Sequence, residues 1–288
     1  MKYRITYAIM GATCLGMLQA EEGGAGHYIP GSMSTLIDLP PTTPGWITEV
    51  SWLHYQGDAS ASRAIPIGGL LVGNLDATSD ALLLGGFHTF ENQIAGAWYS
   101  IGMFVPWVWM EADASLSLGS LNTHIHDHES GLGDIAVLPL LMGWKCGEWQ
   151  YNAALPIYTP TGEYEKGRLA NPGRNHWTFD PTVGISYSGS QSLVNSSFHT
   201  GFSINTENKD TDYKSGTVWH NEFSVQKLYT AGSGLLGVGF NAFYYQQITG
   251  DSGGGANLGD FEGRTIGIGP VLTFLFPRAE SNFVGEIR

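Results

Sequence analysis

Cysteine is scarce in this chain. Only Cys14 and Cys146 occur among its 288 residues, and Cys14 lies close to the N-terminus. If that N-terminal segment is removed, a single thiol remains, so no internal disulfide can form. The chain is therefore not one of the small secreted domains that disulfides hold together.

Basic residues and long apolar runs are also few. The chain has 13 lysines and arginines against 26 aspartates and glutamates. Because this excess of negative charge repels a phosphate backbone, nucleic acid is excluded as a partner. After residue 20, no apolar run reaches the roughly 18 residues that a membrane-spanning helix needs.

The first twenty residues have the pattern of a secretory signal peptide. Lys2 and Arg4 form a positive start, residues 5–18 are mostly apolar, and the small residue Ala20 precedes an acidic pair. We expect cleavage after residue 20, which leaves 11 basic against 26 acidic residues and a net charge of about −15. No composition change marks a domain boundary, so residues 21–288 are expected to form one domain.

Glycine and aromatic residues are abundant, at 40 residues and 12 % of the chain. Apolar side chains alternate with small or polar ones at every second residue, which indicates strands. The clearest alternating segments are residues 149–157, 177–187, 198–204, 236–244 and 266–276. Most are about nine to twelve residues long, which suits a tilted strand that crosses a bilayer. Because lipid cannot satisfy an open sheet edge, we predict an all-β fold, an antiparallel transmembrane β-barrel of about 12 strands.

The same alternation is compatible with a soluble or surface-attached β-barrel that binds a ligand and turns its apolar faces inward. In that alternative Phe240, Leu272 and Phe274 pack in a core. In the transmembrane barrel, the small and polar faces line the lumen instead. The lumen candidates on those faces are Asn152, Asp180, His199, Glu222 and Asn241.

Five prolines lie inside or at the ends of the predicted strands. They are Pro106, Pro139, Pro156, Pro181 and Pro270. Each removes a backbone donor from the sheet, so each is expected at a rim, a bulge or a strand start.

A short run near the C-terminus matches a motif of trypsin-like serine proteases. The letters G-D-S-G-G surround Ser252, and His54, Asp134 and Ser252 follow the order of the trypsin triad. A nucleophile needs a rigid turn and an oriented base, whereas the glycines around Ser252 suit a flexible hairpin connection. The disulfides of secreted trypsin-like enzymes cannot form either. We predict no catalytic residues and no enzyme activity.

A histidine cluster is the weak candidate for a metal site. On a strand, His124, His126 and His128 project to one face, and Asp127 and Glu129 project to the other. Three imidazoles on one face could hold a transition metal. No fourth ligand is indicated, and the two carboxylates point away. We therefore predict no metal and no cofactor.

Residues 156–181 form a long connection that is rich in turn formers and in both charges. Such a segment either folds into the pore or caps it, or it is a solvated surface loop. Arg168 and Arg174 are further candidates for the substrate path. Both are expected to meet Asp or Glu partners within this loop.

Three motifs resemble one known family. They are E-G-G-A-G-H-Y-I-P-G at residues 22–31, G-L-G-D at residues 131–134, and P-T-G-E-Y…R-L-A-N…N-H-W-T-F-D-P within residues 160–181. The family is the group of outer-membrane proteins named for the meta-cleavage pathway of phenol degradation, also called SphA-like transporters. The resemblance covers nearly all of the chain after the signal. It implies a Gram-negative outer-membrane β-barrel that passes small hydrophobic or aromatic compounds and has no catalytic residues.

The C-terminus departs from the usual pattern of such barrels. Outer-membrane barrels commonly end on an aromatic residue that the barrel-assembly machinery reads, whereas this chain ends in G-E-I-R. The closing C-terminal strand is therefore either absent from this chain or short. The expected partners are outer-membrane lipids, the assembly machinery and a small hydrophobic or aromatic substrate.

Overall fold

The computed structural model describes residues 3–9, 21–22, 26–33, 42–59, 65–118, 121–256, 262–277 and 282–287. Within these ranges the regular elements are β-strands, and no helix is long and apolar enough to cross a membrane. The strands are β1 (Tyr3–Ile9), β2 (Gly45–Ala59), β3 (Ile65–Ile67), β4 (Leu70–Ile94), β5 (Ala97–Leu118), β6 (Leu121–Leu132), β7 (Ala136–Cys146), β8 (Trp149–Tyr158), β9 (Thr178–Phe179), β10 (Thr182–Ser188), β11 (Val194–Asn205), β12 (Val218–Ala231), β13 (Gly234–Gln247), β14 (Arg264–Pro277) and β15 (Asn282–Ile287).

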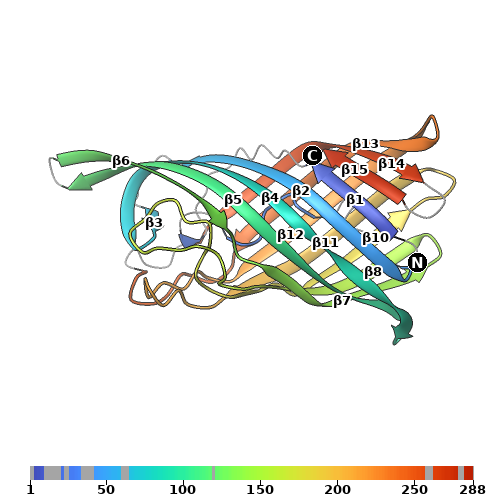
Figure 1. The fold of residues 1–288 in the computed structure, drawn as a ribbon, viewed down its shortest axis with the longest axis horizontal. Coiled ribbons are helices and arrows are strands. Elements are labelled where there is room, and N and C mark those ends of the chain that lie inside the picture. Colours follow the sequence, from blue (N-terminus) through green and yellow to red (C-terminus); the bar gives the residue numbers. More distant parts are fainter. Residues whose placement is uncertain are drawn as a thin grey trace.

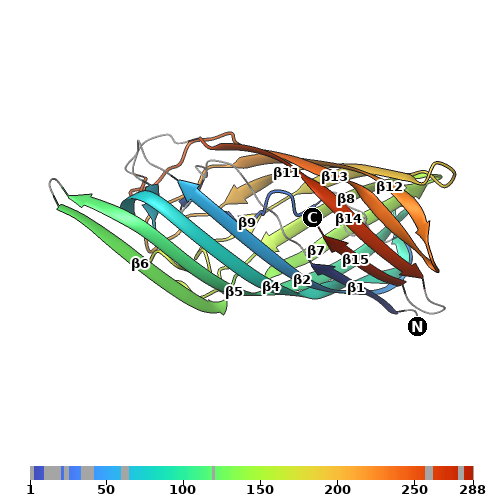
Figure 2. The same ribbon diagram turned by 90° about the horizontal axis from the view of Figure 1, so that it is seen from above.

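Most of these strands form one closed ring. Their hydrogen-bonded order is β4-β2-β1-β15-β14-β13-β12-β11-β10-β8-β7-β5, and β5 pairs again with β4. Because β3, β6 and β9 lie off this ring, twelve of the fifteen described strands make the barrel wall. The strands run obliquely along the elongated barrel in Figures 1 and 2. The predicted all-β barrel of about 12 strands is confirmed.

Strand β1 is an exception to the predicted antiparallel order. It runs parallel to both of its neighbours, with Ile5 opposite Phe283 of β15 and Thr48 of β2. Strands joined by short turns must be antiparallel, whereas the long connection from β1 to β2 returns the chain to the end where β1 began. Strand β1 lies within residues 1–20, whose removal as a signal peptide stays a prediction. That removal would leave eleven of the described wall strands and take away the partner that β2 and β15 share.

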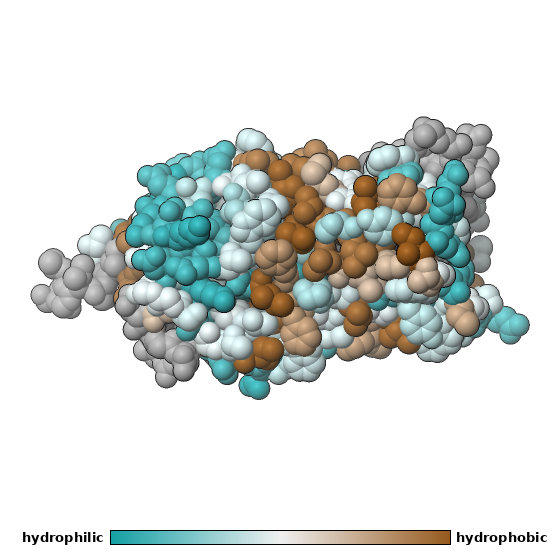
Figure 3. All heavy atoms as spheres, turned by 90° about the horizontal axis from the view of Figure 1, so that it is seen from below, coloured by the Kyte–Doolittle hydropathy of each residue, from teal (hydrophilic) through white to brown (hydrophobic). Residues whose placement is uncertain are grey.

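The apolar faces of the strands point away from the lumen. Phe240 and Leu272 are 39 % and 37 % exposed, and Phe274 is half-buried rather than packed in a core. On the face that Figure 3 shows, apolar side chains form a band flanked by polar surface at both ends. This is the reverse of the arrangement that the soluble ligand-binding alternative requires, so that alternative is not favoured.

The two ends of the barrel differ. At one end short turns join β4 to β5, β7 to β8, β10 to β11 and β12 to β13. At the other end most connections are longer, apart from those between β3 and β4 and between β5 and β6. The longest of these connections is residues 159–177, between β8 and β9. Strands β4, β5 and β6 extend beyond the other strands at the long-loop end (Figures 1 and 2). The inward face of this extension packs around an apolar cluster of Ile65, Ile67, Val72, Leu75, Ala112, Ala114 and Leu169.

The prolines lie where the sheet is irregular. Pro139 falls in a register shift of the β7–β8 pairing, and Pro106 lies where β5 exchanges its neighbour β7 for β6. Pro156 and Pro181 lie in the gap that separates β9 from β10 along β8, so the predicted strand 177–187 is split in two. Pro270 precedes the pairing of β14 with β15, which begins two residues later. The prolines, which lack a backbone N–H donor, therefore lie where the regular pairing of strands is interrupted or has not yet begun.

Candidate functional site

The inward faces of the barrel strands are polar. Strands β8 and β10 to β14 turn small or polar side chains inward, as the complement of their apolar outer faces. The buried polar side chains on these strands include Gln150, Asn152, Ser186, Ser197, His199, Ser203, His220, Glu222, Ser224, Gln226, Asn241 and Thr273. Buried polar groups need hydrogen-bond partners, so their partners must lie inside the lumen.

Asp180 is the centre of one part of this polar interior. It lies between β9 and β10 and is 1 % exposed. Its Oδ1 accepts hydrogen bonds from His220 Nε2 at 2.9 Å and from Thr182 Oγ1 at 2.9 Å. Its Oδ2 accepts a hydrogen bond from Ser203 Oγ at 2.6 Å. These donors compensate a carboxylate that would otherwise be costly to bury.

Residues 26–33, here called the lumen segment, pass through the barrel interior without joining the sheet. The Tyr28 ring is 4 % exposed and stacks on the His220 ring at a centroid distance of 3.8 Å. It also lies nearly parallel to the Tyr245 ring at 6.2 Å. The lumen segment thus packs against side chains of two barrel strands, β12 and β13.

Glu222 of β12 holds the lumen segment in place. Its Oε1 accepts hydrogen bonds from the Tyr28 hydroxyl and from Gly31 N, the latter at 2.9 Å. Its Oε2 accepts a hydrogen bond from Met33 N at 2.9 Å. Asn241 of β13 donates from Nδ2 to Met33 O at 2.9 Å. Two inward side chains therefore satisfy the backbone of a segment that has no sheet partner of its own.

Asp134 makes a second attachment of the lumen segment. His27 Nε2 lies 2.8 Å from Asp134 Oδ2, and the backbone N–H groups of Gly162 and Arg174 donate to the same carboxylate at 2.8 and 2.6 Å. Burial opposes ionisation of Asp134, but these three donors outweigh it and lower the pKa of the carboxyl group. Burial lowers the pKa of the His27 imidazole.

Aromatic rings surround His27. Its imidazole stacks on the Tyr158 ring at 5.0 Å and meets the His176 ring edge-on at 4.9 Å. Burial lowers the pKa of His176 to about 4, so this imidazole is neutral at physiological pH. The lumen segment is therefore flanked by uncharged aromatic faces here as well as at Tyr28.

Two buried carboxyl groups lie near the long-loop end. Glu21 is 6 % exposed and its Oε1 accepts hydrogen bonds from Asn205 Nδ2 and Tyr245 OH, both at 3.2 Å. Burial raises the pKa of Glu21 to about 7. Asp251 accepts a hydrogen bond from the Tyr213 hydroxyl, and burial raises the pKa of Asp251 as well.

Residues 159–177 cap the barrel rather than forming a solvated loop. Leu169 is 1 % exposed, and its backbone N–H donates to Asp127 Oδ2 at 2.9 Å. Arg168 pairs with Asp127, at 2.7 Å between Nη2 and Oδ1, and with Glu129. The prediction that Arg168 meets its acidic partners within the loop is wrong, because both carboxylates come from β6. The loop thus ties itself to the extension of the barrel wall.

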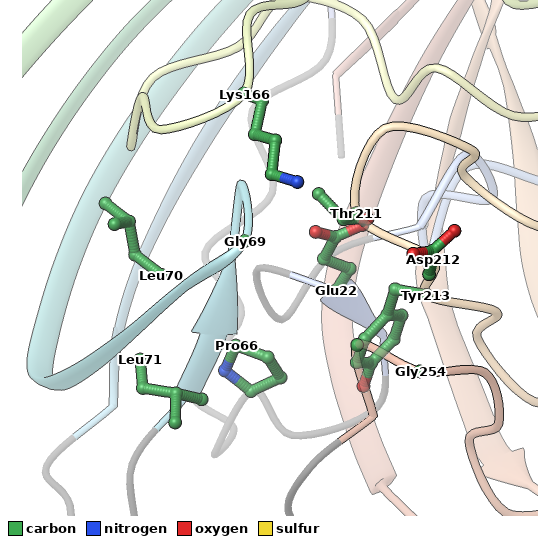
Figure 4. Close-up of a pocket in the computed structure, with 11 residues that line it drawn as sticks. Glu22, Pro66, Gly69, Leu70, Leu71, Lys166, Thr211, Asp212, Tyr213 and Gly254 are labelled. Carbon is green, nitrogen blue, oxygen red and sulfur yellow. Dashed lines mark hydrogen bonds between the residues drawn. The ribbon is translucent and has the colours of Figure 1, made fainter.

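A pocket of about 260 Å³ opens beside this cap. It lies between the β3–β4 turn and the long loops, and Figure 4 shows Glu22, Lys166 and Thr211 pointing toward one another in it. Thr211 Oγ1 donates to Glu22 Oε2 at 3.3 Å. The pocket is lined by Glu22, Pro66, Gly69, Leu70, Leu71, Lys166, Thr211, Asp212, Tyr213, Gly254 and Gly255.

The five residues that the sequence proposes for the lumen are all buried, four of them on the inward faces of strands and Asp180 between β9 and β10. Asn152 Nδ2 and His199 Nε2 lie 2.8 Å apart, and Asn241 Nδ2 lies 3.3 Å from Glu222 Oε2. Asp180 belongs to the separate network around His220. Their contact with a substrate stays a prediction.

Sequence reasoning missed the lumen segment and the rings that pack against it. Tyr28, His220 and Tyr245 were not among the candidates, although the H-Y pair of the lumen segment falls in a motif that carries the family resemblance. Arg174, predicted to meet an acidic partner in the loop, holds Asp134 through its backbone N–H. Its side chain lies near enough to Glu21 to favour ionisation of that carboxyl group.

The structure does not bring together the three residues that follow the order of the trypsin triad. His54 Nδ1 lies 2.8 Å from Asp80 Oδ1 on the outer surface, whereas Asp134 faces His27 in the interior. Ser252 forms a backbone bridge in the loop between β13 and β14. Because His54 and Asp134 each have another partner, the structure does not assemble these three residues into a triad.

The fold and the sequence both have counterparts among known proteins. Over 88 % of each chain, the structure is similar to the crystal structure of an outer membrane channel from Pseudomonas putida F1, with a TM-score of 0.59 and 15 % identity. At that identity the likeness concerns the fold alone. No curated protein sequence matches this chain. The model of one family matches residues 61–284, which is well over half of the sequence. The chain therefore belongs to the family described as "Putative MetA-pathway of phenol degradation".

Proposed function

We propose that the protein is an outer-membrane channel through which small hydrophobic or aromatic compounds pass passively. The outward apolar band supports a location in the bilayer, because it can contact the lipid chains. A closed barrel also leaves no sheet edge with unpaired backbone groups in the lipid. The fold shared with an outer membrane channel supports passage through the lumen. The family description, which refers to phenol degradation, supports an aromatic cargo.

The observation that carries this proposal is the lumen segment. It occupies the path along the barrel, and its polar attachments include Glu222, Asn241, Asp134 and Thr178. A compound that passes must displace it or slip beside it. Displacement of the segment separates the buried rings of Tyr28 and Tyr245, and each then offers a flat face on which an aromatic molecule can stack.

We infer further that residues 1–20 direct export and are then removed. The positively charged start and the apolar stretch that follows it support this inference. Mass spectrometry of protein purified from the outer-membrane fraction tests it. A mature chain that begins at Glu21 is expected, and a chain that retains Tyr3 in the membrane-inserted protein would overturn the cleavage.

The transport proposal is tested in Gram-negative cells that lack the gene and in the same cells complemented with it. We expect complementation to raise the initial uptake rate of a radiolabelled phenol several-fold, while the uptake of a sugar of similar size changes little. Equal acceleration of both solutes would indicate an unselective pore. No acceleration of either, with the protein correctly inserted, would refute the channel.

A further inference from the structure

The histidines that the sequence places on one face of a strand lie outside the lumen. His124, His126 and His128 are all exposed on the outer face of β6, where β5 and β6 extend beyond the barrel. Asp127 and Glu129 project to the opposite face, where Arg168 binds them. The sequence could not show which side chains of the neighbouring strand share the histidine face.

Strand β5 places carboxylates beside these histidines. Asp113 is paired directly opposite His126, and Glu111 directly opposite His128, so all four side chains share one face. His126 Nδ1 lies 2.9 Å from Asp113 Oδ1, and His126 Nε2 lies 3.9 Å from Glu111 Oε1. Ligand atoms of Glu111, Asp113 and His126 all lie within 4.8 Å of one another.

We propose that this face binds one divalent transition-metal ion of the Zn²⁺ type, held by His126 Nε2, Glu111 and His128. Asp113 acts as a positioning residue. Since a carboxylate can only accept, Nδ1 of His126 donates to it and Nε2 keeps its lone pair. A carboxylate that orients a ligating imidazole in this way is a common feature of zinc sites.

The distances suit such a site after a small adjustment. Two ligands of a tetrahedral zinc ion lie about 3.3 Å apart, so His126 Nε2 and Glu111 Oε1 at 3.9 Å need to approach by roughly half an ångström. The rings of His126 and His128 have centroids 5.9 Å apart, and both side chains are exposed. The scaffold is firm, because Ala112 and Ala114 on the other face of β5 are packed in an apolar cluster.

Negative charge on the same face of the sheet also favours the binding of a cation. Asp58 of β2 is paired opposite Asp76 of β4, and Asp76 is paired opposite Asp113, so three exposed aspartates form a row that ends at His126. Like charges directly opposite each other in a sheet are destabilising. No lysine or arginine occurs in β2, β4, β5 or β6 to offset them. A bound divalent ion would relieve this repulsion.

The test is calorimetric titration of ZnCl₂ into the folded, metal-stripped protein in detergent at neutral pH. We expect one ion to bind the wild-type protein, with an affinity reduced at least about tenfold by His126→Ala or by Glu111→Gln. Asp113→Asn is expected to weaken binding about tenfold or more through loss of orientation. Affinity should also fall as pH drops through the range in which imidazoles protonate.

His54→Ala is the matched control. It removes another exposed histidine that is bonded to an aspartate at 2.8 Å, from the outer face of β2, but it leaves the proposed ligands intact. Its zinc affinity should equal that of the wild type, and all variants should keep the β-sheet circular dichroism of the folded barrel. Unchanged zinc affinity in His126→Ala or Glu111→Gln overturns the proposal. Displacement of Zn²⁺ by equimolar Ca²⁺ overturns it too, because that result would indicate a diffuse acidic surface.

Discussion

The attachment of the lumen segment at Glu222 leads to the sharpest prediction. Replacing Glu222 by Gln preserves the shape of the side chain but removes its charge and one of its two acceptor oxygens. Three donors of the lumen segment, on Tyr28, Gly31 and Met33, now converge on the carboxylate. A glutamine oxygen cannot serve all of them, and its amide N–H groups would face other donors.

The size of the effect follows from these bonds. A hydrogen bond to a charged group contributes about 1.5–3 kcal/mol, and contributions at one acceptor are not additive. We expect the substitution to weaken docking of the lumen segment by about 2–4 kcal/mol. Since about 1.4 kcal/mol corresponds to a factor of ten, the ratio of released to docked segment should rise about 30- to 700-fold.

Single-channel recording in planar bilayers measures this change. The Glu222→Gln protein should show larger or more frequent openings than the wild type, because a released segment no longer fills the lumen. Glu148→Gln is the control, since it removes the same charge from the β7–β8 turn, where Glu148 binds Tyr187 and Ser190 instead.

Thiol labelling of the lumen segment is a second, independent measurement of its release. In a protein that lacks Cys14 and whose exposed Cys146 is replaced, Met33→Cys places a single thiol on the lumen segment. Its labelling rate by a polar maleimide should increase when Glu222→Gln is added. If neither conductance nor labelling changes, Glu222 does not hold the segment, and the lumen is blocked in another way.

Three further predictions follow from the same structure. Asp251→Ala should destabilise the barrel by about 1–3 kcal/mol in a urea refolding titration, because it leaves Tyr213 without its buried acceptor, whereas Ser252→Ala should leave both stability and any hydrolytic background unchanged. Ile268→Arg, at a side chain 73 % exposed on the outer face, should cost about 2–4 kcal/mol of folding free energy in vesicles but little in detergent, and equal effects in both would contradict a lipid contact. The pKa of Asp134 is lowered in the folded protein, so its stabilising contribution is complete above the unfolded value of about 3.9 and is lost as pH falls through the lower folded value. Protease protection of residues 159–177 should therefore decline in that acid range in the wild type and show no such step in Asp134→Asn.

Strand periodicity explains why the wall of the barrel could be predicted. In a strand, side chains alternate strictly between two faces, so the outward position of Phe240 and the inward position of Asn241 follow from their neighbours alone. The four lumen candidates that lie on strands are buried for this reason, namely Asn152, His199, Glu222 and Asn241. The break at Pro181 was also foreseeable in kind, because proline cannot donate to a sheet.

Contacts between distant parts of the chain could not be foreseen in the same way. Asp251 belongs to the glycine-rich run around Ser252 that suits a flexible hairpin connection, yet it is buried against Tyr213, 38 residues away. Arg168 was expected to find partners in its own loop, but its partners are 39 and 41 residues away on β6. In a loop no regular alternation fixes the direction of a charged side chain, so its partner depends on how the loop is packed.

By itself, the sequence determined the class of the fold, the approximate number of strands and the side of the wall that each strand residue occupies. These properties depend on local alternation and on the need to hide backbone groups from lipid. Only the tertiary structure decided that Glu222 receives the lumen segment, because 189 residues separate it from Met33. Only the register of β5 against β6 placed Asp113 opposite His126. Register and loop closure join groups across the chain, and that information lies in the packing of the whole barrel rather than in any one segment.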